Sequence, residues 1–205
     1  MNDDLEIIKI VLVGEKGVGK CDIIKLFIGK TNKSLGRFYK SGFGSLIIIL
    51  DDKKIKLLIY NASPNRESGS QAELLCKNAS AVILVYNKAI KGSFEAIENF
   101  WIKKVKEVSP KNAIIAIIEN KENLYNSIDD IDLNKSIEYK FANENGDFFD
   151  KVSVKKKITL TNLFIGIARE VLKKEKIINE TNEKEINEIE MDIIKDGQGC
   201  CCRII

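Results

Sequence analysis

The chain has 205 residues, of which 44% are hydrophobic, and this is enough to bury the core of one domain. A net charge of +3, without a basic stripe interleaved with aromatic residues, argues against nucleic-acid binding. The absence of histidine excludes Ser-His-Asp and Cys-His catalysis, and no window of about 20 residues is apolar enough for a membrane-spanning helix.

The first residues, Met-Asn-Asp-Asp, carry acid where a signal peptide requires base. Asn2 also replaces the glycine that N-myristoylation requires. We therefore expect the protein to be made in the cytosol and to keep a cytosolic pool.

The segment Gly14–Cys21 reads G-E-K-G-V-G-K-C, between an apolar run at 7–13 and a run of helical spacing at 22–28. A glycine-rich loop between a strand and a helix, with lysine near its end, is typical of a phosphate-binding P-loop. A glycine-rich turn in an unrelated α/β domain is the alternative. The expected nucleotide contacts here are Gly14, Glu15, Lys16, Gly17, Val18, Gly19, Lys20 and Cys21. At the last position, Ser or Thr normally offers a hydroxyl to magnesium, whereas Cys21 offers a soft thiol to a hard cation.

The middle of the chain predicts loops, a hairpin and alternating strands and helices. In order we expect a loop at 29–44, strands at 46–50 and 55–60 joined by Asp51–Lys54, a loop at 61–69, a helix at 71–78 and a strand at 81–86. Ser93 is the predicted N-cap of a helix that carries Phe94, Ile97, Trp101 and Val105 on one face.

The rest of the domain continues this alternation. We expect strands at 113–118 and 148–152 and a closing helix at about 160–171. Apolar strands alternating with amphipathic helices predict a mostly parallel α/β sheet with helices on both faces. Such sheets bind ligands at the carboxyl ends of their strands. The loop after each strand is therefore the place to look for a site.

The last part of the chain is predicted to be a tail, residues 179–205, attached to a domain at 1–178. Its polar part favours a largely disordered linker, although isoleucines at helical spacing allow a short helical extension as the alternative. Cys200, Cys201 and Cys202 form a poor zinc site or disulfide framework, so their terminal place favours lipidation.

Several short motifs in fixed order resemble the small GTPases of the Ras superfamily, and within it the Rab family. The runs Lys56–Asn61 and Leu84–Asn87 are similar to the segments that surround the second switch and the following strand. Asn120-Lys121-Glu122-Asn123 resembles the N-K-x-D base motif, and Ser153-Val154-Lys155 resembles S-A-K. The resemblance covers about residues 6–175 and implies the P-loop small G-protein fold with a six-stranded, mostly parallel sheet.

The resemblance implies a GTP/GDP site with magnesium. It assigns base recognition to Asn120, Lys121, Asn123, Ser153, Val154 and Lys155. The family's Asp accepts two hydrogen bonds from guanine, whereas the Asn123 amide accepts one and presents a donor to the other. A buried unsatisfied group costs about 1 to 3 kcal/mol, so we expect weaker guanine selectivity and a better fit to xanthine.

The residues that match the hydrolytic parts depart most from the family. Asn61 has lost the carboxylate that helps organise magnesium, and Asn65 replaces the glutamine that positions the attacking water. Pro64 has no N–H for the γ-phosphate. In the first switch Gly42 stands at the threonine position, and Ser41 serves only if the loop slips by one residue. With Cys21 and Ser41 as the metal candidates, we expect a weakened magnesium site and slow hydrolysis.

The terminal cysteines resemble a Rab prenylation signal. Cys201 and Cys202 are the expected geranylgeranyl sites, with Cys200 as an alternative, because an acidic linker supplies no basic second anchor. The implied partners are guanine nucleotide, a membrane, Rab escort protein, geranylgeranyl transferase, exchange factors and effectors, on the cytosolic face of intracellular membranes.

Two functions fit these observations. The first is a prenylated GTPase that regulates vesicle transport, and the second is a non-hydrolysing relative that serves as a membrane-tethered interaction module. A P-loop kinase is a weaker third possibility, since no basic lid is evident.

Overall fold

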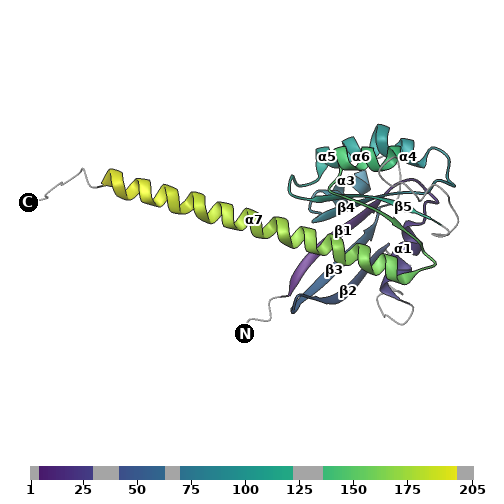
Figure 1. Cartoon of the computed structure of the whole chain (residues 1–205), viewed down its shortest axis with the longest axis horizontal. Helices are drawn as coiled ribbons and strands as arrows, with labels where there is room; N and C mark the ends of the chain where they lie inside the picture. Colours follow the sequence, from purple (N-terminus) through teal and green to yellow (C-terminus); the bar gives the residue numbers. More distant parts are fainter. Residues whose placement is uncertain (1–4, 30–41, 63–69, 122–135, 198–205) are drawn as a thin grey trace, which may run out of the picture. The chain divides into compact units, whose positions relative to one another are not determined.

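The computed structural model describes residues 5–29, 42–62, 70–121 and 136–197. Its elements alternate between strands and helices, as the sequence predicts (Figure 1). They are β1 (Glu6–Val13), α1 (Lys20–Ile28), β2 (Phe43–Leu50), β3 (Lys53–Asn61), α3 (Ser70–Cys76), β4 (Ala81–Tyr86), α4 (Ser93–Ala96), the π-helical η1 (Ile97–Trp101), α5 (Ile102–Val108), β5 (Ile114–Asn120), α6 (Ile137–Asn145), β6 (Phe148–Val152) and α7 (Lys157–Gly197).

The strands form one six-stranded sheet in the order β2-β3-β1-β4-β5-β6. All neighbours are parallel except β2 and β3, which form an antiparallel hairpin. Asp51 and Asp52 make its turn with φ of 49° and 63°, the left-handed conformation that a tight hairpin turn requires. The turn is shorter than predicted because Lys53 and Lys54 already pair with β2. The predicted six-stranded, mostly parallel fold is confirmed.

Helices cover both faces of this sheet (Figure 1). Val11 and Val13 belong to a core cluster with Ala72 of α3 and Trp101 of η1. Because strand side chains alternate between faces, the buried residues Ile8, Ile10 and Leu12 point to the opposite side. On that side α1 packs against the start of α7. The rings of Phe27 and Phe164 stack there with centroids 4.1 Å apart.

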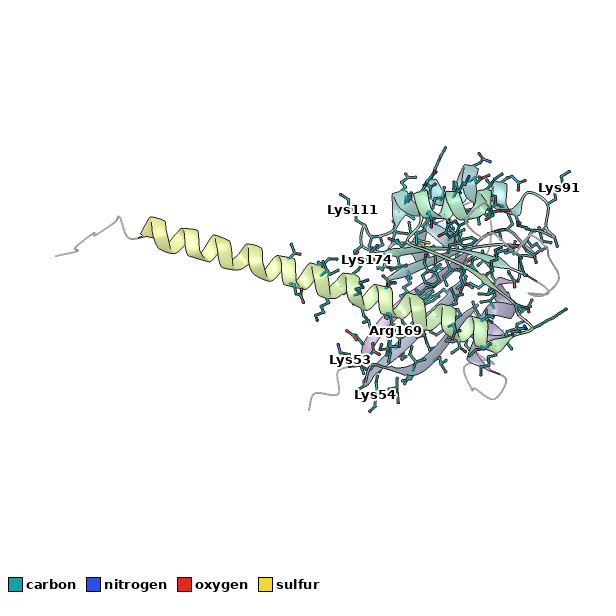
Figure 2. All side chains as sticks on the ribbon, viewed as in Figure 1. Lys53, Lys54, Lys91, Lys111, Arg169 and Lys174 are labelled. Atoms are coloured by element: carbon teal, nitrogen blue, oxygen red, sulfur yellow. The ribbon has the colours of Figure 1, made fainter. Side chains whose placement is uncertain are left out.

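The parallel strands all end at one edge of the sheet, and the hairpin turn lies at the opposite end. Figure 2 shows this separation, because Lys53 and Lys54, which directly follow the turn, lie far from Lys91 in the loop that follows β4. Arg169 forms an ion pair of 3.6 Å with Asp51 at the turn end. The carboxyl edge therefore remains as the place where loops gather.

The helix that begins at Ser93 differs from its prediction at the first turn. Gly92, with φ of 77°, is the N-cap, and Ser93 is the first helical residue without a capping bond. The Ser93 hydroxyl instead donates to the Asn87 carbonyl at 2.7 Å and accepts the Asn87 N–H at 3.2 Å. The prediction of Ser93 as N-cap is therefore wrong, because a buried serine can tie back to the preceding loop.

The final helix is longer than predicted. It continues to Gly197, whereas the sequence analysis favours a largely disordered linker over 179–197. The segment holds no proline and no glycine before Gly197, and lysine, glutamate, isoleucine and methionine all tolerate a helix. The chain divides into two compact units, Met1–Val171 and Leu172–Ile205. In the parts that the structure describes, no helix combines the length and apolarity needed to cross a bilayer.

Candidate nucleotide-binding site

The P-loop follows β1 and turns sharply into α1. Gly14, Gly17 and Gly19 have φ of 144°, 88° and 94°, conformations that side chains rarely adopt. Space also demands glycine, since a Cβ on Gly14 would lie 2.2 Å from the carbonyl oxygen of Val85. The loop therefore packs closely against the sheet. Helix α1 begins at Lys20, and the backbone N–H groups of its first turn point out of its N-terminus.

Lys20 is the buried cation of this loop. Its side chain is 6% exposed, and Nζ donates to the carbonyl oxygens of Gly14 at 2.6 Å and Glu15 at 2.8 Å. Burial lowers the pKa of Lys20 to about 8, although the charge of Glu15 opposes this shift. A polyphosphate would supply the opposite charge that a buried ammonium needs. Lys16 and Gly17, by contrast, are exposed at the outer rim of the loop.

Asn120 joins the predicted base motif to the P-loop. It ends β5, is 4% exposed, and its Nδ2 donates to the Val18 carbonyl at 2.9 Å across 102 residues of sequence. Gly19 lies so close that a Cβ there would come within 2.1 Å of the same nitrogen. The Asn120 Oδ1 is buried and has no hydrogen-bond partner among the described residues. An orphaned buried acceptor at this edge fits a ligand that donates a hydrogen bond.

The third predicted contact, the loop after β6, is fixed beside Asn120. The Lys121 N–H donates to the Val152 carbonyl at 2.8 Å, which ties the base motif to the last strand. Ser153 is 1% exposed, and its hydroxyl accepts the Lys155 N–H at 3.2 Å to form a tight turn. Val154 sits half-buried within this turn. The structure therefore brings the P-loop, Asn120, Lys121 and the Ser153–Lys155 turn to one edge.

Cys21 and Asn61 meet at the start of α1. The Asn61 Nδ2 donates to the Cys21 Sγ at 3.0 Å, and the Asn61 Oδ1 is buried without a partner in the described part of the chain. A thiol and an amide do not match the charged oxygens that magnesium prefers. No group of three or more histidine, cysteine, aspartate or glutamate side chains among the described residues could hold a metal ion. The described side chains on this side of the loop therefore do not fit a magnesium ion.

Trp101 is a site residue that the sequence analysis missed. The helical pattern predicts only that it belongs to the core, and it is indeed 2% exposed. Its indole Nε1 also donates to the Glu15 Oε1 at 2.9 Å, across 86 residues of sequence. The π-helical segment η1 ends at Trp101, and single π turns frequently occur at functional sites. No local sequence signal reports such a contact.

Six predicted residues fall outside the described part of the chain. They are Ser41, Asn65, Asn123, Cys200, Cys201 and Cys202. Their predicted roles in metal binding, catalysis, base recognition and lipidation stay predictions.

Comparisons with known proteins are consistent with this arrangement of the P-loop and the two loops beside it. The model of the Ras family matches residues 9–173. The chain belongs to the Ras family. Among relatives of this Ras-family chain is the Ras-related protein Rab-31 of Rattus norvegicus, 27% identical over 165 residues that cover 80% of this chain and 83% of the relative. The Mus musculus protein of the same name matches with the same figures. The Ras-family chain is thus a Rab-like small GTPase by family, and the family binds GTP or GDP together with magnesium.

Proposed function

We propose that this chain is a membrane-anchored, Rab-like regulator of vesicle transport that binds GTP and hydrolyses it slowly. The observation that carries the proposal is the hydrogen bond from Asn120 to the Val18 carbonyl. It joins the phosphate loop to the base motif, next to the buried ammonium of Lys20. One ligand with a polyphosphate at one end and a planar base at the other would contact both the Lys20 ammonium and the base motif.

Slow hydrolysis follows from the residues on the metal side. Asn61 donates to the Cys21 thiol, so neither side chain offers magnesium a charged oxygen. In the sequence Asn65 stands where the family has a water-positioning glutamine, and Pro64 lacks an N–H. The same substitutions support the second candidate, a non-hydrolysing pseudo-GTPase that serves as a membrane-tethered interaction module. Single-turnover hydrolysis separates them, since the first candidate releases phosphate slowly and the second releases none.

Base choice is expected to be relaxed because of Asn123. An amide there gives guanine one good hydrogen bond and one donor-donor conflict, while xanthine presents a carbonyl at the same edge. Competition between GTP and XTP measures this directly. A strong preference for GTP would overturn the base assignment and leave the phosphate site intact.

Nucleotide binding itself is tested first. The nucleotide that copurifies with the full chain is identified, and calorimetry follows on well-folded, nucleotide-stripped protein with GDP, GTP and their xanthine counterparts. We expect heat from at least one of them. If no purine di- or triphosphate gives heat, the proposal of a nucleotide switch fails.

Membrane attachment is assigned to the terminal cysteines. Two prenyl groups, on Cys201 and Cys202 with Cys200 as the alternative, would supply the two anchors that stable attachment requires. Metabolic labelling with a geranylgeranyl analogue tests this, with single Cys→Ser variants at the three positions. Labelling that survives all three substitutions together would refute the assignment.

A further inference from the structure

Glu119 is a buried carboxylate outside the predicted base motif. It precedes Asn120 in β5 and is 1% exposed. The sheet register places it between Tyr86 of β4 and Lys151 of β6. Because side chains alternate along a strand, Glu119 and Lys121 point to one face while Asn120 points to the other. The end of β5 therefore sends one anchor toward the P-loop and two charged side chains away from it.

The carboxylate of Glu119 has partners on β4 and β6 and in the residue that follows β5. Oε1 lies 4.0 Å from the Lys121 Nζ, and Oε2 lies 3.9 Å from the Lys151 Nζ. The Tyr86 hydroxyl donates to Oε2 at 3.4 Å. Both lysine side chains are only 12% exposed, so these charges are largely removed from water. A buried charge is costly unless it is paired, and removing one partner leaves the others uncompensated.

A second ion pair closes the outer side of this cluster. Lys88, in the loop after β4, contacts Glu138 of α6 at 2.8 Å. The Lys88 charge also lowers the pKa of Glu119, whereas the Glu138 charge raises it. Glu138 therefore belongs to the same charged neighbourhood but pairs with Lys88, which makes it a matched control for Glu119.

Lys121 is thereby held at two points. Its N–H donates to the Val152 carbonyl, and its ammonium lies against the Glu119 carboxylate. We propose that Glu119 is a positioning residue for base recognition, which fixes the ammonium of Lys121 so that the aliphatic stem of Lys121 stays aligned at the carboxyl edge. This inference rests on the proposed function, in which Lys121 contacts the base.

The test measures dissociation of fluorescently labelled GDP from the full chain. Glu119→Gln keeps the shape and a partner for Tyr86 but removes the charge that holds Lys121. We expect dissociation about tenfold faster, less than the full cost of breaking a buried charge pair, because Glu119 acts only on the orientation of Lys121. Glu138→Gln, the matched control, should stay within about twofold because its charge partner is Lys88. Equal rates in the two variants would overturn the inference.

A double-mutant cycle separates positioning from general stability. In a Lys121→Met background Glu119 has no ammonium to orient, so Glu119→Gln should no longer accelerate release. An undiminished effect in that background would show that Glu119 acts through the fold and not through Lys121, and the inference would fail.

The pH dependence of GDP dissociation from the unaltered protein tests the proposal without a substitution at Glu119. Burial raises the pKa of Glu119, and the charges of Lys121, Lys88 and Lys151 oppose this. Protonation releases Lys121, so GDP dissociation should accelerate as the pH falls from neutral to mildly acidic. Among the described residues, the groups that act on Glu119 are Tyr86, Lys88, Lys121, Lys151 and Glu138, and of these Glu138 is the other carboxyl.

Burial pushes the pKa of Glu138 upward, but its hydrogen bonds with Lys88, its own backbone N–H and Ser136, together with the Lys88 charge, lower it below the ordinary value, whereas the pKa of Glu119 is raised. The acceleration should disappear in Lys121→Met, and a flat profile in the unaltered protein would contradict the inference. If the unaltered protein binds no nucleotide at all, the proposed function fails instead, so the two failures are distinguishable.

Discussion

The two sides of the proposed nucleotide site are built from different chemistry. On the phosphate and base side, Lys20 and Asn120 are 6% and 4% exposed and bond to P-loop carbonyls at 2.6 to 2.9 Å. On the metal side, Cys21 is an exposed thiol that accepts one hydrogen bond from Asn61. Gripping a polyphosphate needs main-chain amides and an ammonium, whereas organising magnesium needs charged oxygens. The proposed function therefore treats nucleotide binding and hydrolysis as separate demands on one fold.

The largest expected effect comes from a substitution that inserts a side chain between Gly19 of the P-loop and Asn120 of the base motif. Gly19→Ala places a Cβ 2.1 Å from the Asn120 Nδ2 at a φ of 94°, so either the loop or Asn120 must move. We expect nucleotide affinity to fall by about 100-fold or more, since both ends of the ligand lose their alignment. Calorimetry on the stripped protein measures this.

Gly92→Ala is the control for the strain of a left-handed alanine. Gly92 has φ of 77°, but a Cβ there meets nothing within 4 Å. We expect a cost of about 1 kcal/mol in unfolding free energy and unchanged affinity. Similar affinity losses in both variants would show that strain, and not the contact with Asn120, is responsible.

The second effect is a pH dependence that belongs to Lys20. Burial lowers its pKa to about 8 in the nucleotide-free protein, and a bound polyphosphate raises it again. Above that pH, binding takes up a proton, and affinity falls with rising pH by up to about tenfold per unit. Calorimetry at alkaline pH in two buffers of different ionisation enthalpy measures the proton uptake.

The pH dependence of folding stability has the opposite sign to that of nucleotide affinity. A lowered pKa means that Lys20 contributes stability above its ordinary value of 10.5 and loses that contribution as the pH falls through about 8. The nucleotide-free protein therefore gains stability from Lys20 over the interval in which the ligand loses affinity. Lys20→Met should abolish the proton uptake, and identical heats in both buffers for the unaltered protein would contradict the assignment.

A third, smaller effect tests the metal side. Cys21→Ser combined with Asn61→Asp introduces a hydroxyl and a carboxylate where a thiol and an amide now meet. We expect magnesium to slow GDP release by about tenfold in this double variant and to have little effect on the parent. Release is measured with magnesium and with a chelator.

Cys21→Ala removes the thiol without adding an oxygen and is the matched control. It should behave like the parent. A parent protein that already releases GDP tenfold faster in chelator would show that the metal side is intact, and the contrast between the two sides would disappear.

The smallest effect concerns the contact between Trp101 and Glu15. Trp101→Phe keeps an aromatic ring in the core but removes the donor that holds the Glu15 carboxylate at 2.9 Å. One such bond contributes about 0.5 to 1.5 kcal/mol, so we expect affinity to fall about threefold. Because Trp101 is the sole tryptophan of the chain, its fluorescence should also respond to nucleotide.

Phe100→Leu changes the neighbouring ring, 4.9 Å from Trp101, without touching the hydrogen bond. It should shift the emission and leave the affinity unchanged. If nucleotide leaves the emission of the unaltered protein constant, Glu15 does not transmit occupancy to Trp101.

Local patterns in the sequence were enough to predict most elements. The strands at 81–86 and 148–152 have the predicted bounds, and the P-loop lies between β1 and α1 as its glycines indicate. These features depend on side-chain periodicity and on glycines near one another in the chain, so nearby residues specify them. The predicted Ser93 cap failed because Asn87 offered the hydroxyl an alternative partner. Over 179–197 the structure has helix where the sequence favours a linker, because a polar segment without glycine before Gly197 is compatible with either.

By itself, then, the sequence determined the α/β alternation, the phosphate loop and the order of the motifs. Only the tertiary structure decided that Asn120 holds Val18, that Trp101 holds Glu15, and that Glu119 lies among two lysines and a tyrosine. These contacts join residues far apart in the chain, and their partners are chosen by strand order and register. Local propensity carries no information about either, because both are set by how the whole sheet buries its two faces.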